Sequence, residues 1–103
     1  MGRREEVLAK AAQEEMLRVA KRYVQQLLDT TAQAKGYDNI ISMVSYVNST
    51  KPKWAAEAAV ANQWRDDCWN EALVQLGKYL ATGVKPTEAE FLAAMPTPNW
   101  PTE

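Results

Sequence analysis

One uninterrupted helical pattern between about residues 4 and 35 places the strongest constraint on the fold. The segment contains neither Gly nor Pro, and its apolar positions are three or four residues apart, as on one helix face. One such row is Leu8, Ala12, Met16, Val19, Tyr23, Leu27, Thr30 and Ala34. A helix of this span is about 48 Å long, whereas a compact domain of 103 residues is roughly 33 Å across. The sequence therefore predicts a helix that is too long for its own domain to cover.

A short second helix is predicted over about 38–48. Gly36 is placed to end the first helix in the left-handed conformation, and Asp38 is placed to cap the second helix. The β-branched residues of this segment also suit a strand, but their spacing fits one helical face. Arg65 is expected to reach Asp38 as a charge-assisted partner.

Two further helices complete the pattern. The third is predicted over about 53–82 and ends at Gly83, with Trp64 and Cys68 on its buried row. The fourth follows a capping box, Thr87 to Glu90, and covers about 88–95. We therefore predict an all-α fold in one domain, residues 1–103. In this fold we expect two long antiparallel helices, about 4–35 and 53–82, to pack against two short ones. Oligomerisation is expected to complete the bundle.

The composition argues against most enzyme classes. The chain has no histidine, one cysteine and four glycines, so it lacks the usual general base, a zinc-binding thiolate set and a phosphate-binding glycine loop. We expect no catalytic residue, no cofactor and no metal. The net charge of −1 argues against nucleic acid as a partner. No apolar stretch is long enough to span a membrane, and the charged start does not resemble a signal peptide.

Three chemical groupings have ordinary structural interpretations. The acidic cluster Asp66, Asp67 and Glu71 is expected to be solvated, because one helix rarely supplies a full set of oxygen ligands. Cys68 is expected to be buried and inert. The four tryptophans are expected to lie in the core, with stacking platforms for bases or sugars as the alternative. The lone cysteine also suits a reducing cytoplasm.

Several motifs taken together resemble a small helical domain of bacteriophage and prophage tail proteins, often associated with tail fibres. The resemblance covers about residues 24–101 and is carried by the segments AKGYDNI, PKWAAE, WRDDCW and PTEAE. It implies a non-enzymatic structural or assembly module, located in the virion tail if the protein is native to a phage, with other tail or assembly proteins as partners. The residues that it marks as fold-defining are Gly36, Tyr37, Asp38, Trp64, Arg65, Asp66 and Trp69.

The first 23 residues depart from that pattern. Strong helix formers fill nearly every position, with charges on the outer face, as in designed helices. The segment is either native sequence or an engineered extension or redesigned surface that serves as an assembly building block.

The predicted function is therefore self-association through the long first helix. The expected interface with another copy of the chain consists of Leu8, Ala12, Met16, Val19, Ala20, Tyr23 and Leu27. A dimer is the commonest closed assembly, whereas the tail-fibre resemblance favours a trimer. The alternative is an assembly chaperone that binds an extended peptide or a fibre tip through exposed tryptophans.

Overall fold

The computed structural model describes residues 2–101 and contains four α-helices and one 3₁₀-helix. The elements are α1 (Gly2–Ala34), α2 (Ile40–Val44), the 3₁₀-helix η1 (Ser45–Asn48), α3 (Pro52–Thr82) and α4 (Glu88–Ala93). The described residues form no strand, so the all-α prediction is confirmed and the strand alternative for the second segment is wrong.

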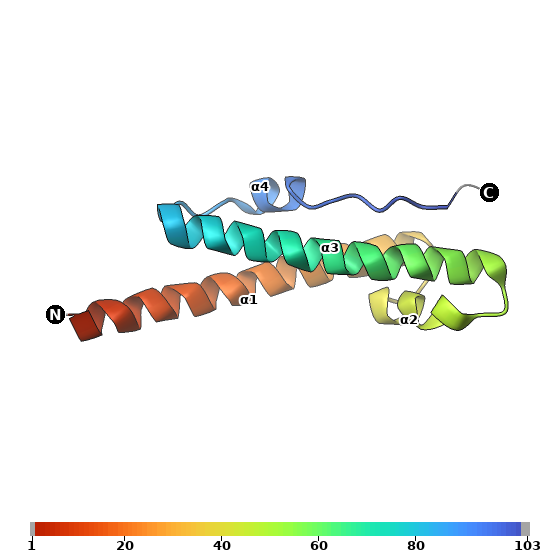
Figure 1. Ribbon diagram of the computed structural model, residues 1–103, viewed down its shortest axis with the longest axis horizontal. Coiled ribbons are helices and arrows are strands. Elements are labelled where there is room, and N and C mark those ends of the chain that lie inside the picture. Colours follow the sequence, from red (N-terminus) through yellow and green to blue (C-terminus); the bar gives the residue numbers. More distant parts are fainter. Residues whose placement is uncertain (1, 102–103) are drawn as a thin grey trace.

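The molecule is elongated, with extents of 61 × 20 × 17 Å. In Figure 1, α1 runs from the N-terminus toward the end that holds α2, and α3 returns in the opposite direction. The two long helices diverge toward the N-terminus, and the first turns of α1 extend beyond the end of α3 (Figure 1). The radius of gyration is 16.8 Å, against about 13 Å for a compact chain of this length. A helix that is longer than its domain therefore sets the shape of the molecule.

The core lies between the second half of α1 and the first two thirds of α3. α1 contributes a buried row from Met16 to Ala32, and α3 contributes a row that includes Trp64 and Cys68. Phe91 of α4 is fully buried and packs against this core. The burial predicted for Trp64 and Cys68 is thus confirmed.

Two glycines end the long helices. Gly36 has φ +96° and Gly83 has φ +73°, which is the left-handed conformation that L residues other than glycine rarely adopt. The amide of Gly83 donates to the carbonyl of Tyr79 and closes the last turn of α3. Both stop positions were predicted correctly, and they direct the chain into the α1–α2 connection and the linker before α4.

The predicted cap of the second helix is wrong by one residue. Asn39, rather than Asp38, is extended, and its Oδ1 accepts a 2.8 Å hydrogen bond from the amide of Ser42. Asp29 of α1 accepts a 3.0 Å bond from the amide of Ile40. Asp and Asn are equally good caps, so only the backbone path determines which of the two occupies the cap. The helix also changes to 3₁₀ geometry after Val44.

The predicted capping box of α4 is present. Thr87 accepts from the amide of Glu90, and the Glu90 carboxylate accepts from the amide of Thr87. These bonds hold the pKa of Glu90 below its usual value. After α4 the tail runs back along α3 (Figure 1), and the indole of Trp64 donates a 2.7 Å hydrogen bond to the carbonyl of Pro96. The box and this bond together position the C-terminal segment.

Candidate functional site

The first turns of α1 form an exposed arm. From Arg4 to Glu15 every side chain that the structure describes is exposed, and the first buried residue is Met16. Val7 and Leu8 are 63% and 62% exposed. Contiguous exposed apolar surface is the usual mark of an interaction surface, so this pair of side chains makes the start of α1 a candidate site. We call residues 4–15 the N-terminal arm.

Part of the predicted interface lies inside the single chain. Met16, Val19 and Ala20 are buried within the protomer, so they are not available to a second copy. Met16 and Ala20 belong to the same buried cluster as Phe91 of α4, so the packing of the single chain covers this part of α1. Tyr23 and Leu27 are half-buried and pack against the core, Tyr23 with its ring 5.7 Å from that of Phe91. Leu8 and Ala12 are the exposed members of the predicted set.

The arm carries charges of both signs. At its C-terminal end, Glu15 accepts from Arg18 at 2.6 Å, with both side chains more than half exposed. The hydrogen bond and charge of Arg18, helped by Lys85 and Arg22, hold the pKa of Glu15 below its usual value. An exposed pair of this kind contributes little to stability, so Glu15 can exchange partners at low cost.

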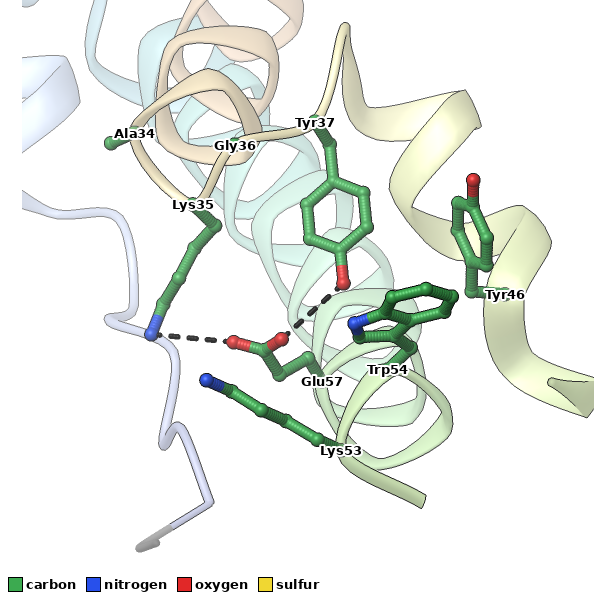
Figure 2. Close-up of a pocket in the computed structure, with 8 residues that line it drawn as sticks. All are labelled: Ala34, Lys35, Gly36, Tyr37, Tyr46, Lys53, Trp54 and Glu57. Atoms are coloured by element: carbon green, nitrogen blue, oxygen red, sulfur yellow. Dashed lines mark hydrogen bonds and ion pairs between the residues drawn. The ribbon is translucent and has the colours of Figure 1, made fainter. Parts of the chain in front are cut away.

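A second candidate site is a hollow of about 450 Å³ at the opposite end of the molecule. It lies where the end of α1, the α1–α2 connection, η1 and the start of α3 meet (Figure 2). Its centre is the carboxylate of Glu57, whose side chain is only 11% exposed. Tyr37 Oη donates to Glu57 Oε1 at 3.3 Å, and Lys35 Nζ lies 3.6 Å from Glu57 Oε2 (Figure 2). Lys53 points toward the same carboxylate (Figure 2).

Aromatic rings line one wall of this hollow. Tyr46 lies 5.6 Å from Tyr37 and 5.6 Å from Trp54, measured between ring centroids. Trp54 is 43% exposed, so the prediction that all four tryptophans lie in the core is wrong for this residue. The Tyr46 ring, in η1, packs edge to face against the indole of Trp54. Burial first, and then the negative charge of Glu57, raise the pKa of Tyr37.

Lys35 connects this hollow to the C-terminal tail. Its ammonium lies 4.8 Å from the ring centroid of Trp100, in cation–π geometry. Trp100 also meets Trp64 edge to face, with centroids 6.5 Å apart. Trp69 is half-buried against the core. The tail, the end of α1 and the start of α3 are therefore held together around one lysine.

The other residues that the resemblance marks as fold-defining have separate surroundings. Arg65 donates at 2.9 Å to Asn62, one turn earlier in α3, so its predicted pairing with Asp38 is wrong. Asp38 is exposed and contributes its backbone carbonyl to Gln33. Asp66 is exposed as well. These residues do not converge on one site.

The acidic cluster and Cys68 lack the features of a reactive site. Asp67 and Glu71 accept hydrogen bonds from Gln63 and Gln75 on the surface of α3. Burial raises the pKa of the Cys68 thiol to about 11. In residues 2–101 no group of three or more His, Cys, Asp or Glu side chains is placed to hold a metal ion.

The hollow around Glu57 was not predicted from the sequence. A signal was present, because Glu57 falls on the same helical row as Ala61, Trp64 and Cys68, and a carboxylate on an apolar row requires a buried partner. Its partners Lys35 and Tyr37 lie twenty or more residues away, so periodicity could not identify them.

Comparisons of the chain with protein-family models, with curated proteins and with solved structures give no match. No helix in the described part of the chain is both long and apolar enough to cross a membrane.

Proposed function

We propose that this protein is a non-enzymatic self-assembly module that forms a homo-oligomer through the N-terminal arm. The observation that carries the proposal is the exposure of Val7 and Leu8 on a helix that extends beyond the rest of the fold. Burying large apolar side chains of this kind stabilises an assembly by roughly 1.5–3 kcal/mol each. A second copy of the chain is the simplest partner for such a surface, because most soluble oligomers are homo-oligomers.

A second exposed apolar surface supports the same proposal. In the C-terminal half of α3, Leu73 and Leu80 are 59% and 51% exposed, and Val84 just beyond it is 70% exposed. This half of α3 lies at the same end of the molecule as the arm (Figure 1). In an oligomer, helices of the other copies would pack against the two long antiparallel helices and their two short partners and so complete a helical bundle.

The motifs that resemble phage tail domains support a structural class of this kind. The strong helix formers in the first 23 residues suit either a native arm or an arm that was added or redesigned as an assembly building block. Whether the arm is native or engineered, we expect the purified protein to associate through it.

The test is a pair of substitutions that cannot disturb the core. Val7→Glu together with Leu8→Glu places like charges at the proposed contact while both positions remain solvated in the single chain. We expect sedimentation velocity to give a monomer for this variant and an oligomer for the unmodified chain. Ile41→Glu is the matched control, because Ile41 is 70% exposed but lies on α2, at the opposite end. An unchanged oligomer in the double variant would overturn the proposal.

A chaperone that binds an extended peptide or a fibre tip is the second candidate. The specific observation in its favour is the exposed indole of Trp54 on the wall of the hollow around Glu57. This candidate predicts a monomer whose Trp54 fluorescence changes when a second polypeptide is added. The self-assembly proposal predicts instead that the mass of the protein changes with its own concentration, without a second polypeptide.

A further inference from the structure

One stripe of the N-terminal arm carries opposite charges at its two ends. Arg4, Leu8, Ala11 and Glu15 are four, three and four residues apart, so they lie on one helix face. Every one of these side chains is exposed. The stripe therefore consists of a cation, a short apolar centre flanked by Val7 and Ala12, and an anion.

This order of charges distinguishes the two ways of pairing two arms. Side by side in parallel, Arg4 would face Arg4 and Glu15 would face Glu15, which is repulsive at both ends. In the antiparallel arrangement Arg4 of each copy faces Glu15 of the other, which gives two attractive contacts. Charge complementarity across an interface fixes orientation and suppresses wrong pairings.

The apolar centre fits the same antiparallel register. If Arg4 faces Glu15 of the second copy, the two-fold axis passes between residues 9 and 10. Leu8 of each copy then lies at the level of Ala11 and Ala12 of the other. Small alanine side chains opposite a leucine allow the two helices to approach closely. A two-fold dimer is also the commonest closed assembly.

We infer that the arm pairs with the arm of a second copy as an antiparallel two-fold dimer, with Arg4 of each copy facing Glu15 of the other. This inference rests on the proposed self-assembly and adds the geometry and the number of copies. Formation of the dimer would give Glu15 a second cation besides Arg18, which in the single chain uses only Oε2 of the carboxylate. A parallel trimer would repeat the like-charge contacts around its axis.

Charge reversal tests the geometry. In an antiparallel dimer, Arg4→Glu gives two Glu–Glu contacts and Glu15→Arg gives two Arg–Arg contacts. We expect each single variant to raise the dimer dissociation constant roughly tenfold, since two exposed pairs change from attraction to repulsion. The double variant Arg4→Glu with Glu15→Arg restores both attractive contacts, and its dissociation constant should return close to that of the unmodified chain.

The controls carry the same changes in net charge on the other side of the helix. Glu6→Arg and Lys10→Glu change exposed residues that lie off the stripe, and they should leave the dissociation constant nearly unchanged. Circular dichroism of all variants checks that the fold is intact.

The possible outcomes separate the two proposals. If the unmodified chain associates but the single reversals do not weaken it, or if the double variant is not restored, the antiparallel pairing is wrong while self-assembly stands. If the unmodified chain does not associate at all, the proposed function fails, and this inference fails with it.

Discussion

The indole Nε1 of Trp64 donates a 2.7 Å hydrogen bond to the backbone carbonyl of Pro96. This bond joins the centre of α3 to the chain just after α4, thirty-two positions further on in the sequence. Trp64 is only 4% exposed, so its polar N–H requires a partner inside the fold. The bond explains why an extended segment with little helical structure lies along α3 rather than in solvent.

Removing this donor should loosen the C-terminal segment. Trp64→Phe keeps an aromatic ring but leaves the Pro96 carbonyl without its indole partner, at a cost of about 1–3 kcal/mol, including the smaller packing volume. Urea unfolding measures the loss, and amide exchange should be faster at Ala94 and Met95, whose amides are hydrogen-bonded just before Pro96. A variant with unchanged stability and unchanged exchange would show that the bond does not hold the tail.

The N-cap of α2 gives a prediction with a built-in control. Asn39→Ala removes the side chain that accepts from Ser42, and a lost cap of this type costs about 1 kcal/mol. Asp38→Ala, one residue earlier, changes an exposed side chain and should stay within about 0.5 kcal/mol of the unmodified chain. Equal losses in urea unfolding of the two variants would contradict the assignment of Asn39 as the cap.

The hollow around Glu57 gives a prediction about alkaline pH. The pKa of Tyr37 is raised by burial and by Glu57, so the folded state favours the neutral phenol. Its contribution to stability is complete below the usual tyrosine pKa of about 10 and is lost as pH rises through the folded value. Glu57→Gln should lower the pKa of Tyr37, because it removes the negative charge beside the phenol.

Absorbance of ionised tyrosine, followed during an alkaline titration, measures this effect. Tyr37→Phe identifies the signal of Tyr37 among the four tyrosines. If Glu57→Gln raises that pKa or leaves it unchanged, the electrostatic part of the explanation is wrong.

Cys68 should be inert in the folded protein. The thiol is fully buried, and its pKa is raised to about 11, so the reactive thiolate is scarce at neutral pH. A thiol reagent should label the native chain slowly at pH 8 and label it rapidly in denaturant. Because the folded pKa is raised, the associated stability is present below the unfolded value of about 8.5 and is lost as pH rises toward the folded one. Rapid labelling without denaturant would contradict this burial.

The positions of the helices could be predicted because the relevant signals are local. Each of these signals acts within a few residues. They are the absence of Gly and Pro between residues 4 and 35, the glycines at 36 and 83, and the capping box at Thr87. The helix ends given by the structure differ from the predicted ones by at most two residues, except that α2 ends at Val44 and the chain continues to Asn48 as a 3₁₀-helix. The cap at Asn39 was missed because two adjacent residues have the same capping chemistry.

The sites depend on contacts between distant segments, and the sequence pattern does not contain these. Met16 and Val19 have the same periodicity as Leu8, yet the former two are buried within the chain and Leu8 is exposed. The difference arises from how far α3 and α4 extend along α1, which depends on three-dimensional packing. The partners of Glu57 were missed for the same reason.

Sedimentation equilibrium of the unmodified chain across micromolar concentrations tests the central claim of self-assembly most directly. We expect a mass that approaches two copies of the 11.6 kDa chain and falls toward one copy on dilution. A mass of one copy at every concentration would show that the chain does not self-assemble, and the exposed leucine of the arm would then need a different partner.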